Sequence, residues 1–400
     1  MRLFGMTLLL LLSGCVTQTV RTVDLTPPRQ SATALTEEQL LDVGVALFDP
    51  NIPEDYDAQV EQMIQREMRL AEARYMPCVA KNMLQSTGNW GAVRVVPRQS
   101  DAVDLTVNGK IIESDGEKLV VDIRVTDASG KTWFDKRYTS LASKYVYLDK
   151  SPQSIDAFQS LYRDLANDML SYRETLSSSD VLEIRQTAEM KFARSFAADA
   201  FSGYLLQIDE GEYQLLRLPA ENDPMLMRVR EIREREYLFI DTLDEFYANY
   251  SRQMLPVYDG WRRATYADAI EFKALQAQSR SQIIGGSLAI AAGIGGIYSS
   301  DNPYVDASGV ASVGGGATLI ISGLNKKQQS AQLADRLREI GSDTEAELIP
   351  TTIQLDNETL RLTGSVEQQY TELRKILRRL YLEEYGLDPS QTSQSPALAN

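Results

Sequence analysis

The sequence predicts an α+β protein with three parts: a small domain of the order β-α-β-β-β, a helical region with a glycine-rich apolar hairpin, and a small C-terminal α/β element. Three observations support this prediction. Short segments of alternating polar and apolar residues, typical of strands, follow one another between residues 93 and 138. Apolar residues at helical spacing dominate residues 151–280. Two glycine-rich runs without charge then follow.

The first folded domain is expected at residues 37–150. An apolar strand at 43–48 precedes a long helix at 57–86, in which we expect Pro77 to produce a kink or a division. A second strand at 93–97 leads into a three-stranded meander. The meander has its turns at Asp115-Gly116 and Ser129-Gly130, both typical of hairpins. Antiparallel strands that follow one another in this way form a sheet with one buried face.

The helical region is expected at residues 151–280. Asp223-Pro224 has the residue types of a helix start, and we expect Pro256 to interrupt the long helix that follows. The aromatic residues of this helix favour a stripe that packs against other helices, with a sugar-binding surface around Trp261 as the alternative. Residues 213–218 are interpreted as a short strand or an extended loop. The C-terminal element, 328–388, is expected to contain a helix at 328–340, strands at 348–355 and 359–362, and a helix at 365–385, before a disordered tail at 389–400.

The apolar hairpin is expected at residues 281–327. Residues 281–300 and 307–325 carry no charge, and each run approaches the length of a membrane-spanning helix. Small residues recur four apart, a glycine-zipper pattern that lets helix backbones approach closely in lipid. The expected membrane or oligomerisation sites are Gly285, Ala289, Gly293, Ser287, Ala291, Gly295, Ala311 and Gly315. We favour a helical hairpin over a β-hairpin of a transmembrane barrel, and three fates stay open: insertion in a membrane, packing against sister subunits or partners, and burial against the protein's own helices.

Composition limits the chemistry that the chain can perform. With 41 basic and 56 acidic residues the formal net charge is −15, which disfavours nucleic acid as a partner. The chain has no histidine, so the commonest general base and metal ligand are missing. Cys78 is interpreted as a buried, inert thiol. We therefore assign no catalytic residue, no metal site and no cofactor.

The N-terminus carries a specific pattern. Arg2 precedes a short apolar run from Leu3 to Leu12, which is the length of a signal-peptide core. The run ends in Leu12-Ser13-Gly14-Cys15, which resembles the lipobox of bacterial lipoproteins. The resemblance implies removal of residues 1–14, a diacylglycerol thioether and an acylated amine at Cys15, and a flexible lipidated tether at 15–36. Because Val16 stands where an Asp favours inner-membrane retention in that family, we expect an outer-membrane anchor with most of the chain in the periplasm.

The β-α-β-β-β order also resembles, over about 110 residues and in pattern only, two periplasmic domains: that of the curli-secretion-channel lipoprotein and the N-terminal domain of the Tol-system periplasmic protein. In those families the domain docks or assembles. The sequence thus predicts an outer-membrane lipoprotein with a structural, assembly or export-accessory role, whose partners are membrane lipid, other envelope proteins or further copies of itself. Two alternatives stay open. One is a cell-wall hydrolase with two carboxyl groups about 5–9 Å apart in a deep cleft, and the other is a glycan-binding module that uses Trp261.

Overall fold

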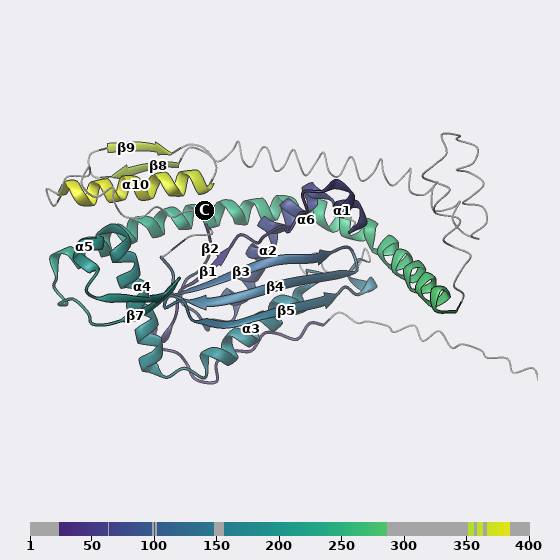
Figure 1. The fold of residues 1–400 in the computed structure, drawn as a ribbon, viewed down its shortest axis with the longest axis horizontal. Helices are drawn as coiled ribbons and strands as arrows, with labels where there is room; N and C mark the ends of the chain where they lie inside the picture. The colour runs from purple at the N-terminus through teal and green to yellow at the C-terminus, as the bar shows by residue number, and fades with distance from the viewer. Residues whose placement is uncertain are drawn as a thin grey trace, which may run out of the picture.

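The computed structural model describes residues 24–62, 64–97, 100, 102–147, 156–285, 351–355, 358–362 and 366–384. It is a mixed structure of one five-stranded sheet, helices and two small hairpins, as the predicted α+β class requires. Figure 1 shows the sheet beside one long helix, α6, which runs past the end of the sheet. The elements are η1 (Glu37–Gln39), β1 (Val43–Ala46), α1 (Tyr56–Glu61), α2 (Arg66–Ser86), β2 (Val93–Val96), β3 (Leu105–Ser114), β4 (Lys118–Asp127), β5 (Thr132–Leu141), η2 (Lys144–Tyr147), α3 (Gln159–Arg173), α4 (Ser178–Phe196), α5 (Ala198–Phe201), β6 (Leu205–Asp209), β7 (Glu212–Leu215), α6 (Pro224–Gly285), β8 (Thr351–Leu355), β9 (Glu358–Leu362) and α10 (Val366–Glu384).

The sheet has the strand order β2-β1-β3-β4-β5. Strand β1 pairs in parallel with β2 and β3, and the meander β3-β4-β5 is antiparallel. In the meander, alternate residues are buried against helices, while the opposite face carries exposed ion pairs, Arg124–Asp135 and Arg137–Asp122. This alternation of apolar and charged side chains explains why the sequence predicts these strands well.

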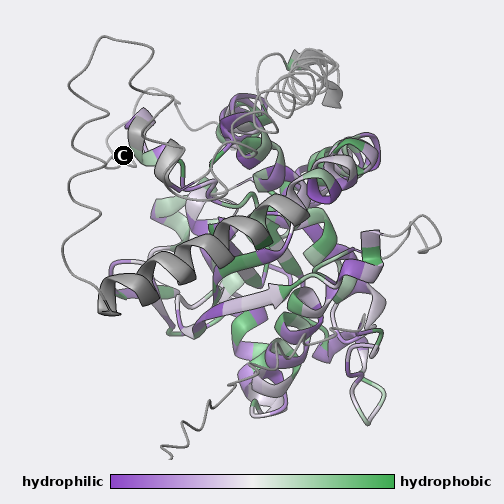
Figure 2. Ribbon diagram, turned by 90° about the vertical axis from the view of Figure 1, so that its right-hand side faces the viewer, coloured by the Kyte–Doolittle hydropathy of each residue, from purple (hydrophilic) through white to green (hydrophobic). Residues whose placement is uncertain are grey.

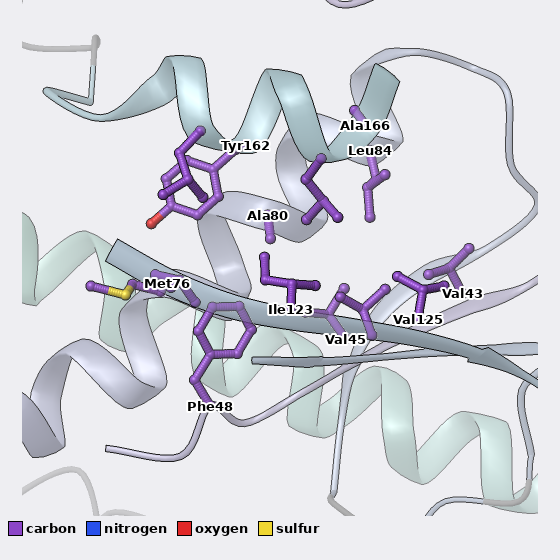
Figure 3. Close-up of a cluster of buried hydrophobic side chains, with 14 of the residues drawn as sticks. Val43, Val45, Phe48, Met76, Ala80, Leu84, Ile123, Val125, Tyr162 and Ala166 are labelled. Carbon is purple, nitrogen blue, oxygen red and sulfur yellow. The ribbon is translucent and has the colours of Figure 1, made fainter. Parts of the chain in front are cut away.

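The main core lies between the sheet, α2 and α3. Figure 3 shows strand side chains meeting the helices, and all the residues that it labels are buried. They are Val43, Val45, Phe48, Met76, Ala80, Leu84, Ile123, Val125, Tyr162 and Ala166. Because α3 supplies the last two, the hydrophobic core continues across the boundary expected near residue 150.

The two helical prolines behave differently from the prediction. The helix expected at 57–86 is divided between α1 and α2, yet Pro77 is not the break and lies buried inside α2. Pro256 likewise does not interrupt α6, so that prediction was wrong. A proline inside a helix costs about 3 kcal/mol. Residues on the successive turns around it, Tyr250, Met254 and Tyr258, are almost fully buried, and their burial stabilises the helix by more than that cost.

A second core joins the C-terminal element to the rest of the fold. Helix α10 packs against α6, where the Tyr370 hydroxyl donates to the Glu236 carboxylate at 2.5 Å. Strands β8 and β9 and helix α10 confirm the strand pair and the last helix that the sequence predicts. Strand β7, Glu212–Leu215, overlaps residues 213–215 and confirms the strand interpretation for that part of the segment. The predicted helix at 328–340, most of the hairpin and the tail at 389–400 lie outside the described residues. Within the described part of the chain, no helix combines the length and the hydropathy needed to cross a membrane.

Candidate functional site

The residues that the sequence singles out for anchoring and assembly lie almost entirely outside the described ranges. Cys15 precedes the first described residue, Asp24, and Gly285 is the last residue of α6. The other small residues of the hairpin fall between 286 and 350. The described residues nearest to these positions are Asp24 and the C-terminal part of α6.

The chain enters the structure against helix α3. Asp24 forms an ion pair with Arg163, and its carbonyl oxygen accepts a hydrogen bond from Gln159 at 2.8 Å. Further along, Arg29 pairs with Glu174 at 2.9 Å, and its backbone nitrogen donates to Asn167 at 2.8 Å. Part of the segment expected as tether thus lies on the body of the protein. Residues 16–23 separate Cys15 from the first of these contacts.

Helix α6 leaves the sheet at the same end of the molecule. The Arg262 guanidinium carbon lies 4.8 Å from the ring centroid of Phe158, which immediately precedes α3. The turn between β3 and β4 also touches α6 here, because a Cβ on Gly116 would come within 2.3 Å of the Arg262 carbonyl oxygen. Tyr147 packs on Tyr266 with ring centroids 5.2 Å apart. In Figure 1 α6 then projects beyond the sheet, and Figure 2 views the molecule from this end.

A buried polar cluster fixes α6 at this point. Arg262 is fully buried and donates to Asp156 at 2.9 Å, and Asp156 also accepts from the Tyr75 hydroxyl at 3.0 Å. The guanidinium lies 3.7 Å from the centroid of the Tyr258 ring. Burial disfavours the charged form of Arg262, but Asp156 and the surrounding tyrosines outweigh that effect and hold its pKa well above the usual value. Burial first, and Asp156 second, raise the pKa of Tyr75.

A second buried carboxylate completes this cluster. Glu72 of α2 accepts hydrogen bonds from the hydroxyls of Tyr258, at 2.6 Å, and Ser114. Arg69 lies 3.4 Å from the same carboxylate. Helix α6 is therefore joined to α2 and to the segment just before α3 by buried, charge-assisted contacts, which are stronger than neutral hydrogen bonds. Glu72 links the same cluster to Ser114 of β3. Sequence reasoning missed this cluster because its members are far apart in the chain, Arg262 and Asp156 by 106 residues.

A charged cleft of about 390 Å³ lies elsewhere, between the starts of β1 and β3 and the helices α4 and α6. Seven of its side chains are ionisable acids or arginines, and most of these have partners within the protein. Arg230 binds the Glu189 carboxylate through two hydrogen bonds, and Arg233 donates to the carbonyl oxygen of Ala102. The cleft is lined by Asp42, Asp104, Arg185, Gln186, Glu189, Arg230, Arg233, Glu234 and Tyr237.

Asp104 lines this cleft and has a raised pKa. Its side chain is 6% exposed, and burial raises the pKa of its carboxyl group to about 6. The Asp42 backbone nitrogen donates to one carboxyl oxygen at 2.9 Å, while Arg233 stands 4.0 Å from the other. These contacts only partly offset the loss of hydration. A carboxyl group with a raised pKa in a cleft is one of the marks of a functional site.

The raised pKa of Asp104 predicts a pH-dependent contribution to stability. Between the unfolded value near 3.8 and the folded value near 6, the folded state holds more protons. The contribution of Asp104 to the free energy of unfolding is therefore complete below about pH 4 and is lost as the pH rises through 6. The whole loss is about 3 kcal/mol. Asp104→Asn should remove this loss. Urea unfolding at pH 4.5 and 7.5 measures it, with exposed Asp135→Asn as the control. An unchanged pH dependence in Asp104→Asn would contradict the assignment.

Two sequence predictions about single side chains can be checked directly. Trp261 is 5% exposed, stacks on Tyr258 and donates from its ring nitrogen to Gln65, so the packing stripe is confirmed. Because the ring is buried, the glycan-binding surface proposed around Trp261 was wrong. Cys78 is buried as predicted, its thiol contacts the Tyr247 carbonyl oxygen, and burial raises its pKa to about 12. Among the described residues no group of His, Cys, Asp or Glu side chains could hold a metal ion.

Comparisons with known proteins add little to this geometry. No family model matches the chain, and no curated protein matches it. Among solved structures, the chain is similar to the crystal structure of protein XCC0632 from Xanthomonas campestris, described with the family model DUF330. The sequences are 13% identical, the TM-score is 0.20, and the match covers 38% of this chain and 95% of that chain.

Proposed function

We propose that this protein is an outer-membrane lipoprotein with a structural, assembly or export-accessory role in the cell envelope. In this proposal Cys15 carries the lipid anchor, and the glycine-rich segment joins copies of the protein to one another or to the membrane. The observation that carries the proposal is that Asp24 and the departing end of α6 lie at the same end of the molecule.

Chain lengths support a common surface for the two segments. Fully extended, the stretch from Cys15 to Asp24 spans at most about 30 Å. The part of α6 from Tyr266 to Gly285 extends about 29 Å at the helical rise of 1.5 Å per residue. The start of the glycine-rich segment can therefore reach the surface that holds the acyl chains. A glycine-rich helix is poor in water, since each Gly costs about 1 kcal/mol relative to Ala, so lipid or a second copy would stabilise it.

The rest of the molecule fits a supporting role. Buried contacts to Arg262 and Glu72 hold α6 firmly on the sheet. At the opposite end, the hairpin β6-β7 exposes Leu206 and Ile208, and Leu216 is exposed just after it, so apolar surface is available away from the proposed anchor. Such surface is typical of sites that contact other proteins.

The test is the size of the mature protein extracted in mild detergent, with and without residues 283–324. The intact protein is expected to form a defined oligomer, and the deletion variant a monomer that keeps the folded body. Circular dichroism and unfolding of the deletion variant provide the control. Well-behaved monomers in both cases would contradict assembly through this segment.

Asp104 supports a second candidate, a carboxylate-dependent hydrolase. Its carboxyl group has a raised pKa and lines a cleft together with Asp42 and Glu234, so it meets one of the conditions of the hydrolase alternative. This function would make Asp104 the general acid. Release of soluble fragments from purified cell wall, lost in Asp104→Asn, would favour it over the assembly role. No release by the folded wild-type protein would exclude it.

A further inference from the structure

We propose that the end of the body from which α6 departs contacts the membrane through a small group of exposed apolar and aromatic side chains. This group, here called the end face, consists of Leu25, Tyr56, Leu141 and Tyr145. This inference rests on the proposed lipid anchor at Cys15. It adds to that proposal a second contact with lipid and a fixed orientation of the body.

The four side chains come from separate parts of the chain but gather at one end of the fold. Leu25 follows Asp24, which contacts the start of α3. Leu141 ends β5 and pairs with Lys118 beside the β3-β4 turn. Tyr145 lies in η2, where the hydroxyl of Tyr147 donates to the Gly116 carbonyl oxygen at 2.7 Å.

Tyr56 reaches the same end through α1. This helix is followed by Gln65, whose side chain accepts a hydrogen bond from Trp261 at 3.0 Å. Trp261 immediately precedes Arg262, where α6 meets the β3-β4 turn. Figure 1 shows α1 beside α6 at the end where α6 departs.

The type of side chain distinguishes this end from the other. Among the described residues, the exposed aromatic side chains are Tyr56 and Tyr145, at 73% and 40% exposed. The opposite end exposes only aliphatic side chains on its hairpin, including Leu206 and Ile208. Tyrosine has an apolar ring and a polar hydroxyl, and it concentrates at the level of lipid headgroups. The aromatic content of the end face therefore points to a membrane surface as its partner.

The length of the tether limits the distance between the end face and the membrane that holds the anchor. The stretch from Cys15 to Asp24 can span at most about 30 Å, so the end face cannot lie far from a membrane that holds the lipid at Cys15. The Lys144 ammonium group lies 5.3 Å from the Tyr145 ring centroid and adds one cation. Glu54 and Asp55 precede Tyr56 and oppose an attraction to anionic lipid. We therefore attribute the membrane contact to the tyrosine rings and test it on zwitterionic lipid.

The experiment uses the full lipidated protein in phosphatidylcholine vesicles that contain a spin-labelled lipid as quencher. A fluorophore is attached through Leu141→Cys at the end face, or through Ile208→Cys at the opposite end as the matched control. Acylated Cys15 does not compete for the label, and neither does buried Cys78 with its high pKa. Both labelled positions are exposed, so neither substitution removes a core contact.

The expected result is quenching at Leu141→Cys and none at Ile208→Cys. Replacing both rings, by Tyr56→Ser and Tyr145→Ser, is expected to shift the equilibrium between membrane contact and a free body by about tenfold. The quenching at Leu141→Cys should fall accordingly. Equal quenching at both ends, or quenching that persists without the rings, would overturn the inference.

The experiment distinguishes a protein that is not lipidated at Cys15 from a lipidated protein whose end face does not contact the membrane. Intact-mass analysis and flotation of the same sample report whether Cys15 carries lipid. A lipidated, vesicle-bound protein without quenching at Leu141→Cys overturns the end face and leaves the anchor standing. An unmodified Cys15 together with loss of flotation overturns the proposed function, and the end face with it.

Discussion

Replacing Asp156 with alanine is expected to lower the free energy of unfolding by about 3–5 kcal/mol, because it leaves the fully buried charge of Arg262 without its partner. Arg262→Met should cost less, since Tyr75 still donates to Asp156. The double variant should cost less than the sum of the two, because neither charge then remains buried alone. Urea unfolding of the four proteins completes this double-mutant cycle.

The chain offers a matched control for this cycle in the exposed pair Arg124–Asp135. Its side chains are 61% and 50% exposed, although the nitrogen and oxygen atoms lie 2.6 Å apart. Asp135→Ala is therefore expected to cost at most about 1 kcal/mol. If Asp156→Ala and Asp135→Ala had similar effects, Arg262 would not be the residue that fixes α6.

The second large effect concerns Cys15. Cys15→Ser removes the proposed site of acylation, and each buried CH₂ of an acyl chain contributes about 0.8 kcal/mol to membrane binding. We expect the protein to move from the membrane fraction to the soluble fraction almost completely. Fractionation of cells that express each form, followed by extraction at high pH, measures the distribution.

The outcome also separates the anchor from the glycine-rich segment. If Cys15→Ser remained in the membrane fraction and was released only by the further deletion of residues 283–324, the segment itself would hold the protein there. If Cys15→Ser stayed bound even after that deletion, lipidation at Cys15 would not be the anchor.

The fold could be predicted where a local pattern decides it. Alternating burial in β3 and β4 and the glycine turns between the strands predict the meander because each feature acts over a few residues. The continuity of α6 could not be predicted, because Pro256 is tolerated only through tertiary burial of Tyr258 and Met254. Sequence rules include the free-energy cost of a proline inside a helix but not the tertiary packing that offsets this cost.

The candidate site likewise has parts that a local sequence pattern predicts and parts that depend on tertiary packing. Cys15 and the small residues after Gly285 carry patterns that can be read in the sequence. The positions of the described residues nearest to them, Asp24 and the end of α6, depend on how α3 and α6 pack. The pairing of Arg262 with Asp156 spans 106 residues and has no local signal. Likewise, nothing in the sequence around Arg29 indicates its ion pair with Glu174, which places the entering chain on the body.

The length of α6 has a mechanical consequence. Its 62 residues extend about 93 Å at the helical rise, and a helix shortens only when its backbone hydrogen bonds break. It is held at Glu236 by α10 and at Arg262 by Asp156, just before α3, about 39 Å apart along the helix. A displacement at one of these points is therefore transmitted to the other through the helix. Helix α6 thus sets the distance between α10 at one end of the body and the start of α3 at the other.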